Sequence, residues 1–149
     1  MEDFDRTLDS LRRLCAKREC CSRELFQKAE KALGREKAKE IVDNLKKESY
    51  VDDLRYARAF VHDKAMYDGW GPKKISYALA LKSIPDNYIS EALEGYDWSE
   101  ALEKLRKSLE IKAKSLENDK NARARLIKLA LSRGFSYDMI ARALSSIPG

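Results

Sequence analysis

Apolar residues recur along this chain at steps of three and four positions, the spacing that lines one face of an α-helix. Leu54, Ala57, Phe60, Val61 and Ala65 form one such stripe. Two later stripes consist of Leu102, Leu105, Leu109 and Leu116, and of Met139, Ile140, Ala143, Leu144 and Ile147. The pattern predicts an all-α protein without strands, with helices at residues 5–18, 22–33, 36–48, 52–67, 72–82, 86–94, 98–117, 120–133 and 136–146.

Several of the predicted helix ends carry capping residues. Asp52 and Ser136 stand where a side-chain oxygen accepts a hydrogen bond from a free N–H group of the first turn. Asp97, followed three residues later by Glu100, resembles a capping box. The breaks between helices are marked by Gly69 and Gly71, by the left-handed terminators Gly34 and Gly134, and by Pro72, which suits a first turn.

The same helical plan occurs more than once. Residues 75–93 match residues 126–144 at a shift of 51, and residues 25–45 fit with a slightly different turn, since Ile41 and Leu45 precede Ile89 and Leu93 by 48. The matched pairs include Ile75 with Leu126, Leu79 with Ala130, Ile84 with Phe135, Ile89 with Ile140, and Ala92 with Ala143. The alternative is chance similarity between amphipathic helices. The periodicity predicts three tandem three-helix repeats, at 1–50, 51–96 and 97–149, in an elongated, curved, solenoid-like array.

Composition agrees with a helical protein. Of the 149 residues, 37% are charged and 44% hydrophobic, and only three are proline. No apolar run approaches the roughly 18–20 residues of a membrane span, and the acidic start MEDFDRTLDSLRRL is unlike a secretory signal. We therefore expect a cytoplasmic protein with no membrane partner. Three close cysteines, Cys15, Cys20 and Cys21, make a poor disulfide or metal framework and are expected to be small, partly buried helix residues.

The net charge of +5 is unevenly distributed, with +2 on residues 1–50, −2 on residues 51–97 and +5 on residues 98–149. A basic C-terminal third is typical of a surface that meets phosphates or an acidic protein. The alternative is an ordinary solvated face rich in lysine. The charge pattern does not decide between these interpretations.

Few residues suggest chemistry. Asp52 and Asp53 form a carboxylate pair, but their place before a helix favours capping, with a role in joining the first repeat to the second. His62 has no neighbouring nucleophile with an orienting partner, and residues 69–74 lack the spacing of a phosphate-binding loop. We predict no catalytic residue, no metal site and no cofactor.

The centre of the chain resembles the RecX family. Residues 50–53 and 56–61 are similar to its "YLDD…FA..FV" signature, and residues 71–84 to its "GP..I...L..KGI" stretch. Residues 22–25 and 133–135 also match the family pattern, whereas Ser83 stands where glycine is usual and Ala32-Leu33-Gly34 replaces a Lys-Gly pair. The structural signature comprises Asp52, Asp53, Tyr56, Ala57, Phe60, Gly71 and Pro72, of which Tyr56 and Phe60 are expected in the core.

The resemblance implies a non-enzymatic regulator built from three-helix units. Such a protein binds in the groove of the RecA–DNA filament and inhibits ATP hydrolysis and strand exchange by RecA, and so modulates recombination, DNA repair and the SOS response. Its partners are the RecA recombinase filament and, through it or directly, single- or double-stranded DNA. We expect a monomer.

Partner-binding candidates are the basic residues of equivalent helices, together with Trp70, which is expected in a partly exposed turn. They are Arg23, Lys28 and Lys31 in the first repeat, Lys73, Lys74 and Lys82 in the second, and Lys120, Arg123, Arg125, Lys128 and Arg133 in the third. Side chains on equivalent helices of a repeat array tend to share a face, so these residues are candidates for one basic track. The alternatives are solvated lysines without a partner, and a stand-alone helical module that binds nucleic acid.

Overall fold

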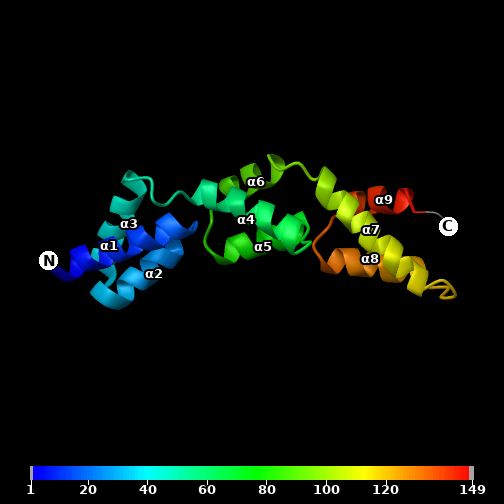
Figure 1. Ribbon diagram of the computed structural model, residues 1–149, viewed down its shortest axis with the longest axis horizontal. Helices are drawn as coiled ribbons and strands as arrows, with labels where there is room; N and C mark the ends of the chain where they lie inside the picture. Colours follow the sequence, from blue (N-terminus) through cyan, green and yellow to red (C-terminus); the bar gives the residue numbers. More distant parts are fainter. Residues whose placement is uncertain (1, 148–149) are drawn as a thin grey trace. The chain divides into compact units, whose positions relative to one another are not determined.

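The computed structural model describes residues 2–147, in which nine α-helices and no strand are found (Figure 1). The helices are α1 (Glu2–Lys17), α2 (Ser22–Leu33), α3 (Arg35–Lys47), α4 (Asp53–Tyr67), α5 (Pro72–Leu81), α6 (Asp86–Glu94), α7 (Ser99–Ser115), α8 (Ala122–Ser132) and α9 (Tyr137–Ser145). Each matches a predicted helix; the largest difference at an N-terminus is in α1, which begins at Glu2. The fold is therefore all-α, in three tandem three-helix repeats.

The described residues form two compact units. One holds the described residues up to Ala59 together with Leu79–Ala92, and the other holds Phe60–Ala78 together with the described residues from Leu93 onwards. The first unit contains the first repeat (α1–α3) and the second contains the third repeat (α7–α9), while α4, α5 and α6 each contribute residues to both. Met1, Pro148 and Gly149, the outermost positions of the predicted repeats, lie outside the described residues. The predicted boundaries after residues 50 and 96 stay a prediction.

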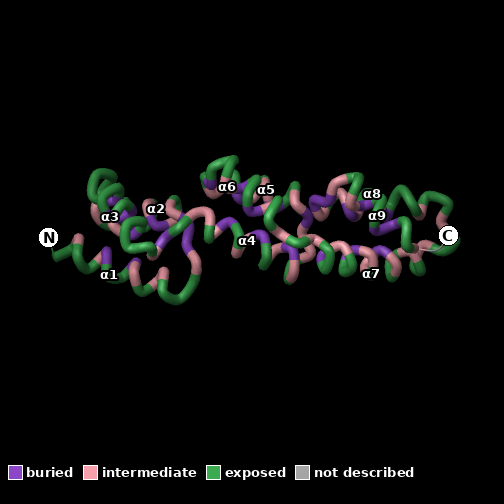
Figure 2. The backbone as a smooth tube through the Cα atoms, turned by 90° about the horizontal axis from the view of Figure 1, so that it is seen from above, coloured by how far each residue is buried: buried purple, intermediate pink, exposed green. Residues whose placement is uncertain are grey.

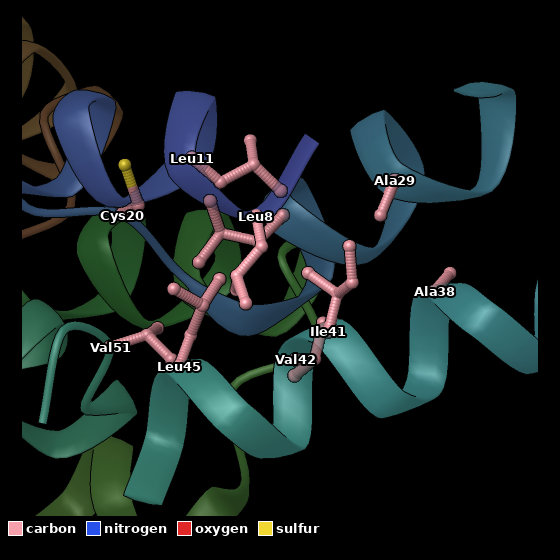
Figure 3. Packing of buried hydrophobic residues seen from close by; sticks show 10 residues of the cluster. Leu8, Leu11, Cys20, Ala29, Ala38, Ile41, Val42, Leu45 and Val51 are labelled. Carbon is pink, nitrogen blue, oxygen red and sulfur yellow. The ribbon is translucent and has the colours of Figure 1, made fainter. Parts of the chain in front are cut away.

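Leucine, isoleucine and alanine side chains fill the core of the first repeat (Figure 3). Leu8 and Leu11 of α1 meet Ala29 of α2 and Ile41 and Leu45 of α3, and all five are at most 6% exposed. Figure 2 shows buried and exposed positions alternating along each helix, as the spacing of three and four requires. Each fully buried leucine or isoleucine contributes roughly 1.5–3 kcal/mol through the hydrophobic effect.

The core of the third repeat is built on the same plan, but it also contains a buried aromatic side chain, Phe135. Leu105 and Leu109 of α7 pack with Leu126 of α8 and Ile140 of α9, and Phe135, between α8 and α9, is only 2% exposed. The outer members of the predicted α7 stripe, Leu102 and Leu116, are only half-buried at the edge of this core.

Equivalent turns carry equivalent hydrogen bonds, which supports the repeat at the level of the backbone. Ser83 after α5 and Gly134 after α8 both have positive φ, 63° and 96°. The Ser83 turn therefore keeps the left-handed conformation that glycine adopts at no steric cost. The four bonds are Ile84 N to Leu79 O (3.2 Å), Ser83 N to Ala80 O (3.0 Å), Phe135 N to Ala130 O (3.2 Å) and Gly134 N to Leu131 O (2.9 Å), related in pairs by 51 positions.

Two of the three predicted caps are confirmed. Asp52 Oδ1 accepts a hydrogen bond from the Arg55 amide (3.0 Å), and Ser136 Oγ accepts one from the Met139 amide (3.2 Å). The capping box at Asp97 and Glu100 is wrong, because α7 begins at Ser99 with Trp98 as its N-cap residue. Asp97 instead accepts hydrogen bonds from the amide and hydroxyl of Ser99 (3.0 and 2.7 Å), which lowers the pKa of its carboxyl group.

Candidate functional site

The two carboxylates at the start of α4 both accept hydrogen bonds from backbone amides. Asp52 caps α4, and Asp53 accepts hydrogen bonds from the amide (2.8 Å) and the hydroxyl (2.5 Å) of Ser22, at the start of α2. The Asp53 carboxylate therefore satisfies a free N–H group of α2 and joins the first repeat to the start of the second. This arrangement agrees with a capping role for the pair.

Gly71, another signature residue, lies against the backbone that follows α8. Its amide donates to Arg133 O (2.6 Å), and the amide of Lys73 donates to Gly134 O (2.9 Å). A Cβ atom at Gly71 would lie 2.5 Å from the carbonyl carbon of Gly134, and one at Gly134 would lie 2.5 Å from Lys74. The two glycines thus permit a backbone contact between α5 and the turn after α8, and Pro72 opens α5 as predicted.

The signature aromatic residues are less buried than expected. Ala57 is fully buried, but Tyr56 and Phe60 are only half-buried. The prediction that both aromatic residues belong to the core is therefore wrong, because each lies at its edge. Desolvation of the Tyr56 hydroxyl raises its pKa to about 12. Phe60 meets Trp70 edge to face, with ring centroids 6.5 Å apart.

Trp70 is half-buried, as predicted, and its ring already has cationic partners. The Nζ atoms of Lys64 and Lys74 lie 4.8 and 4.6 Å from its centroid, within the range of a cation–π interaction. Lys64, which the pattern of the sequence did not single out, also pairs with Asp68 (2.9 Å). The structure therefore joins two candidates, Trp70 and Lys74, in one partly exposed basic–aromatic cluster.

Of the candidates in the first unit, Arg23 has a structural role. Its Nη1 donates to the carbonyl of Leu81 (2.5 Å) and to the hydroxyl of Ser83 (3.2 Å), so the guanidinium ties α2 to the end of α5. Lys28 and Lys31 are exposed on α2. Lys82 lies in the turn after α5 and not in the helix, because α5 ends at Leu81.

The candidates in the second unit also divide into engaged and solvent-facing residues. Arg125 pairs with Asp119 (2.8 Å), and Arg133, the C-cap residue of α8, donates to Ser108 Oγ (3.0 Å). The exposed remainder, none of which forms an ion pair with another described residue, consists of Lys73, Lys120, Arg123 and Lys128. Lys120 precedes α8 instead of lying within it.

A second group of exposed cations was missed. Arg6, Arg13 and Lys17 lie on one edge of α1, where they line a groove with Lys28. Their spacing of seven and four positions was a usable signal. These three residues lie outside the segments that repeat along the sequence.

The three cysteines are free thiols in different surroundings. Cys15 is half-buried in α1, whereas Cys20 and Cys21 are buried in the connection before α2, so the prediction that all three are partly buried helix residues is wrong for these two. Desolvation raises the pKa of the Cys20 thiol to about 12 and also raises the pKa of Cys15. All three are free thiols, and no cluster of three or more potential metal ligands occurs among residues 2–147.

His62 is exposed, and its nearest polar partner is the adjacent Asp63, 3.1 Å from Nδ1. No helix in the described part of the chain combines the length and the apolar character needed to cross a membrane.

Comparison with known proteins places these helices in a recognised class. Residues 52–93, which contain α4–α6, match a family model described as the second three-helix domain of RecX. The chain is 36% identical over 110 residues to "Regulatory protein RecX" of Bacillus pumilus, and 37% identical over 102 residues to the protein of that name from Vibrio parahaemolyticus. These matches cover 70% and 65% of this chain, but only 41% and 62% of the respective relatives.

Solved structures show the same fold over nearly the whole chain. The crystal structure of RecX from Lactobacillus salivarius aligns with a TM-score of 0.87, covering 98% of this chain and 97% of that one at 23% identity. A second crystal structure, of a regulatory protein RecX, aligns with a TM-score of 0.81 over 97% of this chain and 71% of that one. The class is that of helical regulatory proteins made of three-helix domains. The chain belongs to the RecX family.

Proposed function

We propose that this chain binds the RecA–DNA filament and inhibits ATP hydrolysis and strand exchange by RecA, and thereby modulates recombination and DNA repair in the cytoplasm. The observation that carries the proposal is the match of residues 52–93 to the second three-helix domain of RecX, in a chain whose relatives are named regulatory proteins. The family is one of regulators and not of enzymes. A monomer bound along the filament is the expected form.

Exposed cations are the candidate contacts. Lys73 and Lys74 lie at the start of α5, next to Trp70, and Lys120, Arg123 and Lys128 lie on or just before α8. All five face solvent, so a partner reaches their ammonium and guanidinium groups without disturbing a core. RecA-bound DNA and acidic protein surfaces both supply the negative charge that such groups bind.

A titration of RecA ATP hydrolysis on single-stranded DNA tests the proposal. Adding the protein at substoichiometric amounts is expected to lower the hydrolysis rate. The double variant Lys73→Glu/Lys74→Glu is expected to inhibit less, whereas Lys37→Glu/Lys39→Glu, with the same change in charge on exposed positions of α3, is expected to inhibit normally. Unchanged hydrolysis at equimolar protein, together with no detectable binding to the filament, would reject the proposal.

A stand-alone nucleic-acid-binding module is the second candidate. It is favoured by Lys120, Arg123 and Lys128, which have no ion-pair partner among the described residues, and by the net charge of +5 on residues 98–149. It predicts DNA binding in the absence of RecA, with an affinity that falls steeply between about 50 and 200 mM salt. DNA binding that is absent, or that does not change with salt, removes this candidate.

A further inference from the structure

An open groove with a volume of about 610 Å³ lies between α1 and α2 of the first repeat. Its base is apolar, formed by Leu11, which is 5% exposed, and by the half-buried Leu14. Its rim is basic and exposed, with Arg6, Arg13 and Lys17 on α1 and Lys28 on α2. The groove therefore combines an aliphatic surface with four cations.

Helix geometry explains why these cations gather at one edge. Successive residues of an α-helix are about 100° apart, so Arg6, Arg13 and Lys17 fall almost in line along α1. Arg12, one position before Arg13, lies on the edge that faces α3, where it pairs with Glu48 (2.6 Å) and Asp9 (2.9 Å). The two edges of α1 thus differ: Arg12 pairs with carboxylates on one edge, whereas the cations on the groove edge have no such pair among the described residues.

The rim cations have no ion-pair partner among residues 2–147. Lys28 lies near enough to Glu24 to lower the pKa of that carboxyl group, but the main cause of the lowering is Arg18, whose guanidinium binds Glu24 at 2.5 Å. Four like charges around one groove repel one another, and a bound anionic group would relieve the repulsion at all four.

Both surfaces of the groove have to be matched by its occupant. An amphipathic acidic peptide places apolar side chains on Leu11 and Leu14 and carboxylates beside the cations, where bidentate pairing with Arg6 and Arg13 is available. A nucleic-acid strand matches the charge, but no aromatic residue lines the groove for its bases to stack on. We propose that the α1–α2 groove is a docking site for an acidic amphipathic segment of a protein partner. This role is separate from the proposed inhibition of RecA.

The stretch of α1 from Arg6 to Lys17 is about 17 Å long at 1.5 Å per residue, which matches a peptide helix of about 12 residues. A suitable probe is a fluorescent 12-residue peptide with glutamates on one face and leucines on the other, titrated with the intact protein and without RecA. Binding is expected to weaken as salt rises, since the rim is exposed. A peptide with every leucine replaced by serine is expected to bind at least about tenfold more weakly, because it loses the apolar contact.

Charge-matched variants locate the site. Arg13→Glu/Lys17→Glu is expected to weaken binding of the leucine-containing peptide by about tenfold or more, and Lys37→Glu/Lys39→Glu by less than about twofold. Circular dichroism checks that both variants remain helical. Equal weakening by both pairs, no binding, or insensitivity to leucine replacement would overturn the proposal. So would an oligothymidylate of equal charge that binds the groove more tightly than the peptide, because the occupant would then be nucleic acid.

Discussion

The first and third repeats share a fold but place their charges differently. In the first repeat, two ion pairs join separate segments: Arg12 of α1 reaches Glu48 after α3, and Arg18 after α1 reaches Glu24 of α2. Arg12 also pairs with Asp9 within α1. In the third repeat, most ion pairs run along single helices: Arg106 pairs with Glu103 and Glu110 of its own α7, and Arg142 pairs with Asp138 within α9. The exception is Arg125 of α8, which pairs with Asp119 just before that helix.

The contrast shows that buried apolar side chains stabilise the helical bundle, whereas the ion pairs determine the distribution of charge on its surface. Exposed ion pairs contribute about 0–1 kcal/mol each, much less than a buried side chain, so the two charge arrangements are compatible with one fold. Their main consequence is local, because they decide which cations remain free. On α1, Arg12 is paired, whereas Arg13 and Lys17, on the edge that lines the groove, form no ion pair among residues 2–147.

The largest expected effect concerns Phe135 of the third repeat, an aromatic residue that is almost completely buried. Phe135→Ala is expected to lower the free energy of unfolding by about 3–5 kcal/mol, since it loses apolar burial and leaves a cavity. Phe26→Ala in α2 of the first repeat, where the phenyl ring is only half-buried, is expected to cost less, roughly 1–3 kcal/mol. Urea unfolding followed by circular dichroism measures both. Equal losses would show that the cores do not differ in this way.

Exchanging serine and glycine between the two equivalent turns, at positions 83 and 134, separates two costs of a side chain at positive φ. One is the strain of the left-handed backbone, and the other is the steric clash of the Cβ atom with its neighbours. Gly134→Ser is expected to destabilise by well over 1 kcal/mol, because its Cβ atom meets Lys74 at 2.5 Å in addition to the backbone cost. Ser83→Gly is expected to change stability by at most about 1 kcal/mol, since relief of the left-handed conformation is offset by the lost Arg23 hydrogen bond and by backbone entropy. Thermal unfolding measures both variants. Similar costs for the two exchanges would mean that close packing at Gly134 is unimportant.

The smallest expected effect is the coupling between Arg18 and Glu24, at about 0.2–1 kcal/mol near neutral pH. Arg18 lowers the pKa of Glu24, so the folded state holds this carboxylate ionised more strongly than the unfolded chain does. The coupling is therefore fully present above the unfolded pKa, about 4.3, and is lost as pH falls through the folded value. A double-mutant cycle with Arg18→Gln and Glu24→Gln, repeated at decreasing pH, measures it. A coupling that persisted at about pH 2 would contradict this account.

Helix positions and the repeat were predictable because they depend on local spacing. All nine helices and the confirmed caps at Asp52 and Ser136 follow from apolar periodicity and from polar residues at helix starts. The capping box at Asp97 failed because the helix begins one residue later than predicted, at Ser99, and a start that shifts by one position changes which side chain meets the free N–H groups.

Candidate partner residues were harder to predict, because residue type alone does not say whether a cation is already engaged. Arg23, Arg125 and Arg133 looked like surface cations, yet each makes a specific contact within its unit. Arg13 and Lys17 were passed over, yet they line a groove.

The amino-acid sequence by itself determined the helices, their order and the family signature, because each depends on neighbours three or four positions apart or on a short motif. The tertiary structure alone decided the close approach of Gly71 to Gly134, the carboxylate of Asp53 on the start of α2, and the pairing of Arg12 beside the unpaired Arg13. These features join residues that are distant in the chain, and only packing of helix on helix brings their atoms within bonding distance.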